Sequence, residues 1–418
     1  MPTARRFSWW WVVVAVVVAA DLAQCLKKGT SELPVYALGG ERMAEGVEIY
    51  KTSDPKPFTY PPFFALPFVP LMWLGETAQR VVWYFVNLLA LMWVVRVLQG
   101  VVAPLLDSRA RRWFWVALAA VAGRHVLAVF ENQSHDLLVT GCVVAGAAAW
   151  SRAQGLRAGA WAGLGAACKA TPALFAVPFV LNRSGWAIFG AVLFGVGATL
   201  LPDLLLPRAD GHLWVQAWIE VMLPGAKPGS SADLGGTWHA GSLLNQGLAG
   251  TLYRLTTPVA LTADSPWAVD SALVAASPEL RKIITLAGQL TVLALVAWAC
   301  RPGIGRHVVA SAQPIVRLAQ AGAVACGMVL LSPMSSKSHF AVLLVPLAAA
   351  LVAWLRVRRD LLLTVLLVGV FVLGTLLTKG LLGSTLGNVT LAYGSVTWTA
   401  FLALLAALRA QQVMRAER

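Results

Sequence analysis

The sequence predicts an all-α polytopic membrane protein, and three observations support that prediction. Of the 418 residues, 58% are hydrophobic and only 12% are charged, whereas soluble domains carry about 25% charged residues. The apolar runs are close to the ~20 residues that a helix needs to cross a bilayer. These runs do not alternate between apolar and polar residues, as the strands of a membrane barrel would.

The run 158–181 contains Lys169 and Pro172 near its middle. Proline removes a helix donor, and a lysine is costly in a bilayer core, so we expect two arms, 158–169 and 171–182, that meet at the membrane surface. With this division the chain has about 12 membrane segments of near-spanning length in a single domain, residues 1–418. The apolar runs cover 8–26, 80–105, 113–130, 136–151, 158–181, 184–206, 283–300, 313–332, 339–355, 361–379 and 393–412.

Basic residues explain the formal net charge of +14 and predict the orientation. They cluster in short connections between apolar runs, which the positive-inside rule places in the cytoplasm. We therefore expect both termini in the cytoplasm and two long loops, 27–79 and 207–282, on the outer face. The bias toward Ala, Leu, Val and Arg fits a bacterial source, so the expected location is the bacterial inner membrane. No continuous basic face with interleaved aromatic residues is present, which argues against nucleic acid as a partner. The basic connections are 106–112, 152–157, 182–185, 301–312 and 356–360.

Two carboxylates near the first apolar run are candidate general bases. Glu32 follows that run by a few residues, where it could take a proton from an attacking hydroxyl or be an ordinary solvated loop acid. Asp21 lies inside the run, where a charge costs roughly 2.5–3.5 kcal/mol. It is the alternative base, unless it only occupies a polar groove at the helix end.

Four basic side chains on the predicted outer side could hold a phosphate. Lys169 interrupts its apolar hairpin and is either a point charge for phosphate or a lysine that snorkels to the interface. Lys337 and His339 lie in the polar stretch 332–339, which could also be a plain surface turn. Arg124 lies within an apolar run, and an ionisable residue there is a functional candidate by default.

Other polar residues on this side are candidate substrate contacts. Gln133 and His135 belong to the polar turn 131–136, and His239 lies in the tryptophan-containing loop 207–282. Such residues could equally form an ordinary polar turn and a headgroup belt. The five cysteines are widely spaced without a CxxC pair, and no Walker, HExxH, GxSxG or DxD motif occurs, so we expect neither a metal nor a cofactor.

Six short motifs, in this order, resemble glycosyltransferase family 87, whose polytopic GT-C-type members use polyprenyl-phosphate sugars. The resemblance covers most of residues 10–360. The motifs are Glu32-Leu-Pro-Val35-Tyr36, Gly46-Val-Glu-Ile-Tyr50, Tyr60-Pro61-Pro62, Asn132-Gln133-Ser134-His135, Lys169-Ala-Thr-Pro172 and Ser332-Pro333-Met-Ser335.

The resemblance implies an inverting transfer of a sugar, most often mannose, from polyprenyl phosphate to a lipid or glycan acceptor on the outer face. It places the base on Glu32, where the family usually has aspartate, and it implies that Tyr36 and Tyr60 contact substrate. Tyr60 lies in the aromatic, proline-rich stretch 58–62, which could also be an interfacial anchor. Membrane lipids are expected neighbours of such an enzyme.

Two alternatives stay open. A transporter or lipid-linked-sugar flippase would have inverted halves with paired broken helices, and only one broken segment is evident here. An inactive relative is motivated by Ser336-Lys337-Ser338-His339, where the family usually carries Trp-Asp-His-His. The sequence therefore points to a membrane glycosyltransferase with its site on the outer face.

Overall fold

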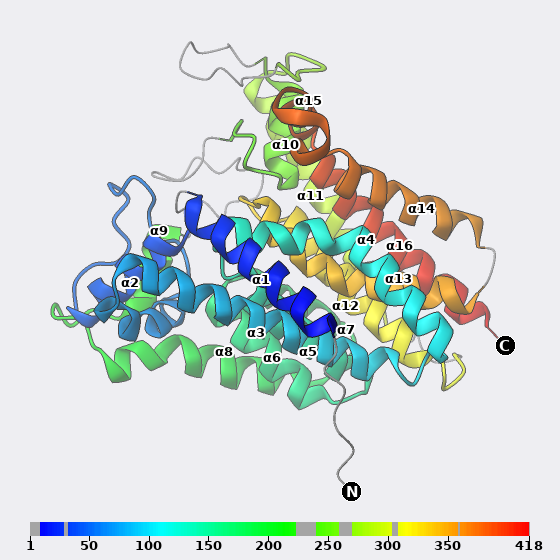
Figure 1. Cartoon of the computed structure of the whole chain (residues 1–418), viewed down its shortest axis with the longest axis horizontal. Helices are drawn as coiled ribbons and strands as arrows, with labels where there is room; N and C mark the ends of the chain where they lie inside the picture. Colours follow the sequence, from blue (N-terminus) through cyan, green and yellow to red (C-terminus); the bar gives the residue numbers. More distant parts are fainter. Residues whose placement is uncertain are drawn as a thin grey trace, which may run out of the picture.

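The computed structural model describes residues 9–28, 32–222, 240–258, 270–302, 308–357 and 360–417. Helices account for the regular structure of these residues, and no strand occurs among them. Most of the long helices lie side by side in one bundle, with α2 and α9 gathered at one side and α10 and α15 at one end of it (Figure 1). The prediction of an all-α polytopic membrane protein is confirmed.

The helices have the following bounds. In chain order they are α1 (Trp9–Lys27), α2 (Leu33–Ala44), η1 (Pro62–Trp73), α3 (Glu76–Val102), α4 (Ser108–Asn132), α5 (Asp136–Ser151), α6 (Gly155–Cys168), η2 (Thr171–Phe175), α7 (Ala176–Leu181), α8 (Gly185–Leu205), α9 (Trp214–Met222), α10 (Leu248–Thr256), α11 (Pro278–Ala299), α12 (Gln313–Leu330), η4 (Lys337–Leu343), α13 (Leu344–Arg356), α14 (Leu361–Phe371), η5 (Val372–Leu376), α15 (Lys379–Ala392) and α16 (Ser395–Ala416).

Seven helices of the described chain are long and apolar enough to cross a membrane, and a bent pair brings the number to eight. The pair is Leu361–Leu376 with Lys379–Ala392, which meet at 92°. Some other apolar helices are shorter; α5 has 16 residues, or about 24 Å of rise. The chain is thus multi-pass, while the count of about 12 segments stays a prediction.

The expected break at Lys169 is present. Helix α6 ends at Cys168, and Lys169 has extended backbone angles of φ −158° and ψ 122°. Pro172 then falls in the first turn of η2, where a missing backbone donor is harmless. The two arms meet at this break, so Lys169 projects from the end of a helix and not from the middle of an unbroken apolar helix.

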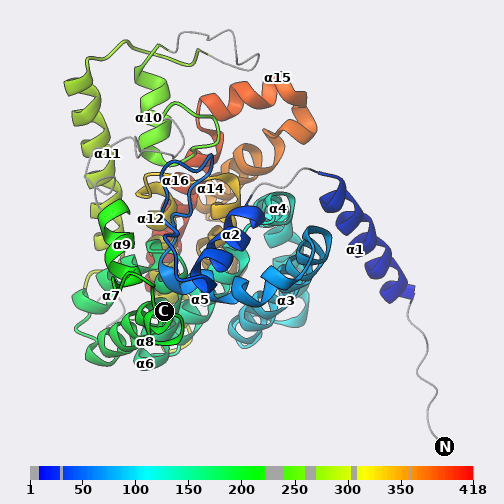
Figure 2. The same cartoon turned by 90° about the vertical axis from the view of Figure 1, so that its left-hand side faces the viewer.

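The two long connections 27–79 and 207–282 fold in part into helices. The first contains α2 and η1, and the second contains α9 and α10. Tyr36, Phe64 and Phe68 of the first connection are fully buried together with Trp214 of the second, in an apolar core separate from that of the bundle. This second core holds α2 and α9 together, and Figure 2 shows α2 between α9 and α1 in that view.

Candidate functional site

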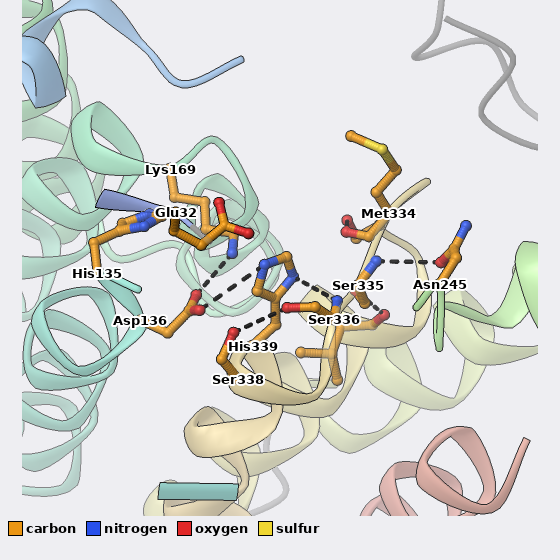
Figure 3. Close-up of polar contacts among 12 residues, drawn as sticks. Glu32, His135, Asp136, Lys169, Asn245, Met334, Ser335, Ser336, Ser338 and His339 are labelled. Atoms are coloured by element: carbon orange, nitrogen blue, oxygen red, sulfur yellow. Dashed lines mark hydrogen bonds and ion pairs between the residues drawn. The ribbon is translucent and has the colours of Figure 1, made fainter. Parts of the chain in front are cut away.

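Polar side chains gather at one end of the bundle, and the antiparallel order of the helices brings them there. Helix α4 ends at this membrane face, α5 begins there, α6 ends there and η4 begins there. Figure 3 shows residues from these elements converging, with Asp136 and Lys169 on one side and the stretch from Met334 to His339 on the other. Residues far apart in sequence thereby form one polar cluster.

Asp136 is the centre of this cluster. Its carboxylate accepts a hydrogen bond from Lys169 Nζ at 2.8 Å, and its other oxygen lies 3.9 Å from His339 Nε2 (Figure 3). The backbone N–H of Ser336 donates to His339 Nδ1 at 3.3 Å. Because Nδ1 accepts, the neutral ring carries its proton on Nε2, which faces Asp136. The three side chains form a buried, charge-balanced group.

Glu32 lies in the same neighbourhood, at the N-cap position of α2. Its carboxylate accepts a hydrogen bond from Lys56 Nζ at 2.7 Å, and its side chain is 14% exposed. The negative charges of both Glu32 and Asp136 help to raise the pKa of Tyr36 and of Tyr60, so both carboxylates lie close to the same two phenols. The structure therefore brings the predicted base to the cluster around Asp136.

Tyr36, Tyr60 and His135 form the aromatic wall of the site. Tyr36 Oη and His135 Nδ1 share a hydrogen bond of 2.9 Å, and the Tyr60 and His135 rings are edge to face at 4.5 Å. Burial is the largest cause that raises the pKa of both tyrosines well above the usual value, so both phenols stay protonated. His135 Nε2 is buried without a hydrogen-bond partner in the described structure. The wall thus offers polar groups to a ligand.

A second, small cavity of about 20 Å³ lies beside η4, and it is basic. Arg124, His125, Lys337 and Lys379 contribute to its lining. The Arg124 guanidinium donates two hydrogen bonds to the Glu131 carboxylate, at 3.1 and 3.2 Å. Neither Lys337 nor Lys379 has an ion-pair partner among the residues that the structure describes. This cavity therefore carries positive charge that the described part of the protein does not neutralise.

The structure divides the four predicted phosphate contacts between the two cavities. Lys169 and His339 belong to the group around Asp136, and that group lines a small cavity with Thr171 and Ser335. Lys337 and Arg124 belong to the basic cavity. Both Lys337 and His339 come from η4, the short helix between the cavities.

Three other predicted residues are not part of the cluster as described. Gln133 donates to the carbonyl of Cys25 at 3.2 Å, with left-handed backbone at the end of α4, and so connects α1 to the turn. Asp21 accepts a hydrogen bond from Tyr84 at 3.0 Å, between α1 and α3. His239 lies outside the described residues.

Sequence reasoning left three residues of the site without a role. Asp136 is one of several polar residues in the turn 131–136, and only its position as the first residue of α5 distinguishes it. Lys56 is one of several charges in an irregular connection. Lys379 ends the apolar run 361–379, and a lysine at that point of an apolar run could have signalled a break.

The fold and the site define a multi-pass membrane protein with carboxylates and cations gathered at one membrane face. Comparison with known proteins gives the family. The model of glycosyltransferase family 87 matches residues 58–333, which is well over half of the chain. The chain belongs to glycosyltransferase family 87, and it is accordingly a glycosyltransferase.

Individual relatives are more distant. The chain is 27% identical over 346 residues to a polyprenol-phosphate-mannose-dependent alpha-(1-2)-phosphatidylinositol mannoside mannosyltransferase of Mycobacterium tuberculosis, covering 78% of this chain and 71% of that protein. Among solved structures, ArnT from Cupriavidus metallidurans bound to undecaprenyl phosphate is similar with a TM-score of 0.43 and 13% identity, over 98% of this chain and 78% of that one. Its apo form gives a TM-score of 0.38 and 16% identity, over 95% and 77%.

Proposed function

We propose that this protein is a GT-C-type enzyme that transfers a sugar, with mannose favoured, from polyprenyl phosphate to a lipid or glycan acceptor on the outer membrane face. Family membership and the mannosyltransferase relative support the donor class. The observation that carries the proposal is the pair of cavities around η4. One is lined by Asp136, with the carboxylate of Glu32 close by, and a carboxylate can take a proton. The other is lined by cations that outnumber the nearby described acids and can hold a phosphate.

Glu32 is the proposed base. It takes the proton of the acceptor hydroxyl while the hydroxyl oxygen forms a bond to the anomeric carbon. The bond between that carbon and the phosphate oxygen breaks at the same time, and the phosphate leaves with the electron pair. Attack opposite to the leaving group inverts the anomeric configuration. Lys56 Nζ donates a hydrogen bond to the Glu32 carboxylate at 2.7 Å and so fixes its position.

Lys337 and Arg124 are the proposed ligands of the donor phosphate. Lys337 lines the basic cavity and has no carboxylate partner among the described residues. Arg124 also lines it, and its partner Glu131 is half-exposed, so solvent screens that pair. Lys379 also lines this cavity and adds a third positive charge. Cations aimed at the leaving group stabilise the negative charge that develops on it in the transition state. The bend between α14 and α15 borders this cavity, which Leu377, Thr378 and Lys379 help to line.

Lys169 and His339 have a different proposed task. Both are held by Asp136, so their charge and orientation are set before substrate arrives. From the other side of η4 they can donate hydrogen bonds to the sugar or to the leaving oxygen. Tyr36, Tyr60, His135 and His239 remain the proposed substrate contacts, and so does Gln133.

The orientation is part of the proposal. The basic connections at the opposite end of the helices favour the cytoplasm there. This places both termini in the cytoplasm of a bacterial cell and the site outside, where a lipid-linked donor is the source of an activated sugar without a nucleotide.

The test is a transfer assay on the full chain in nanodiscs, with radiolabelled polyprenyl-phosphomannose and total membrane lipids as acceptors. We expect Glu32→Gln to lower kcat by about 10²–10⁴-fold, the range for loss of a general base, while the protein stays folded. Glu45→Gln, an exposed acid at the end of α2, is the matched control and keeps full activity.

Two outcomes would contradict parts of the proposal. Loss of transfer in Asp21→Asn, with Glu32→Gln active, would move the base into α1. Transfer by none of the forms, with several sugar donors, would exclude the proposed reaction and favour a transporter or an inactive relative.

A further inference from the structure

A large cavity lies at the end of the bundle opposite the candidate site. Its volume is about 760 Å³. Helix α12 connects the two places: Gln313 and Arg317 near its start line this cavity, and Met328 and Val329 near its end line the cavity around Asp136. The 18 residues of α12 rise about 27 Å, close to the thickness of a bilayer core. The cavity therefore opens at the other membrane face.

The charge in this cavity is positive and uncompensated within the described structure. Arg183 and Arg317 line it, and no aspartate or glutamate is among its described lining residues. Neither guanidinium forms an ion pair or a hydrogen bond with the residues that the structure describes. Asn182, beside Arg183, donates to the carbonyls of Pro178 and Cys300, at 2.9 and 3.0 Å. The turn that carries Arg183 is thus anchored to α7 and to the end of α11.

Three helices begin at this cavity. Gly155 of α6, Ser184 at the start of α8 and Gln313 of α12 all line it. None of the three helices has a side-chain cap or an acidic residue in its first turn. The positive ends of the three helix dipoles attract an anion. By contrast, α4 and α14 begin at the same membrane face with an aspartate cap, Asp107 and Asp360.

A side-chain amide also lines the cavity. Gln320 is 2% exposed, and its Oε1 accepts a hydrogen bond from Trp150 Nε1 at 3.0 Å. This bond fixes the oxygen, so the amide NH₂ is the free end of the side chain. No partner of that NH₂ is found among the described residues, although Gln320 lines the cavity. This NH₂ is therefore available to an acceptor atom of a ligand in the cavity.

We propose that this cavity binds the phosphate of an anionic lipid headgroup at the membrane face opposite the candidate site. The two arginines, the helix starts and the Gln320 amide supply only donors and positive charge, which suits phosphate oxygens. The lipid origin follows from the place and the walls. The cavity lies at the membrane surface, and Trp186 at its rim is 69% exposed, as tryptophans of the interfacial belt are.

The experiment measures lipid binding to the full chain in detergent by native mass spectrometry, without any sugar donor, so its result does not depend on the proposed function. The probes are phosphatidylglycerol, phosphatidylcholine and inorganic phosphate. We expect phosphatidylglycerol to bind at least tenfold more tightly than phosphatidylcholine. The variant Arg183→Gln/Arg317→Gln should lose that preference, and Arg112→Gln, an exposed arginine at the same membrane face, should keep it.

A second variant keeps the test informative if the double variant does not fold. Gln320→Leu removes the free NH₂, together with the acceptor of Trp150 Nε1, without changing charge, and we expect it to weaken phosphatidylglycerol binding severalfold. Equal binding of both lipids would overturn the proposal. An equal loss of the phosphatidylglycerol preference in Arg112→Gln would also overturn it, because the preference would then come from the basic surface in general and not from this cavity. Binding of inorganic phosphate but not of the lipid would overturn its lipid origin.

Discussion

The two cavities beside η4 differ in how their charges are balanced. Around Asp136 each charge has a partner: Lys169 is 2.8 Å from the carboxylate, and His339 faces its other oxygen. Around Lys337 the positive charges outnumber the one nearby acid, Glu131. A balanced buried group keeps its geometry without a ligand, whereas an unbalanced one is relieved when an anion binds. The first cavity thus holds Lys169 and His339 in fixed positions, and the second suits the binding of an anion.

The largest expected effect tests the balanced side. Asp136→Asn leaves the Lys169 ammonium buried without its carboxylate, and breaking such a buried pair costs about 3–5 kcal/mol of unfolding free energy. Both side chains are largely buried, with 4% and 12% exposed. Chemical denaturation in detergent, followed by tryptophan fluorescence, measures the loss.

The double variant Asp136→Asn/Lys169→Met separates pairing from chemistry. Because both charges are gone, we expect it to regain most of the lost stability while transfer stays low. Equal stability of wild type and Asp136→Asn would show that the pair is not a balanced unit, and the comparison of the two cavities would fail.

The next effect tests the unbalanced side. Lys337→Gln and Lys379→Gln should each raise the KM for the polyprenyl-phosphate donor by about tenfold, since a hydrogen bond to a charged group contributes about 1.5–3 kcal/mol. Stability should stay the same or increase, because each change removes repulsion among like charges. Steady-state kinetics with varied donor measures this, with exposed Lys282→Gln on α11 as the control. Stability losses like that of Asp136→Asn would instead show that these lysines are structural.

Much of the fold could be predicted from the sequence, because the signals are local. The apolar runs became helices close to their predicted bounds, and the break at Lys169 followed from a proline beside a lysine. The loops were predicted less well. Residues such as Tyr36 and Phe64 pack into a separate core. No periodicity of apolar residues in the sequence predicts this core, because its members include Trp214 from the other long connection.

The sequence predicted which residues belong to the site better than it predicted which residues pair with one another. Glu32, Lys169 and His339 do come together, because antiparallel helices bring alternate connections to one face. The hydrogen-bond partners of these residues could not be predicted. Lys56 lies 24 positions from Glu32, and Asp136 lies 33 from Lys169. The side of η4 on which Lys337 and His339 project depends on packing, which sequence spacing alone does not determine.

The smallest expected effect sharpens the comparison from the acidic side. Glu131→Gln removes the acid that holds Arg124 and leaves the basic cavity with one more uncompensated charge. Glu131 is 43% exposed, so solvent screens the pair and the gain is modest. We expect the donor KM to fall by about two- to threefold at low salt, with less change at high salt. Exposed Glu41→Gln in α2 is the control. A rise in KM would mean that Glu131 orients Arg124 toward the phosphate, and that orientation outweighs net charge in this cavity.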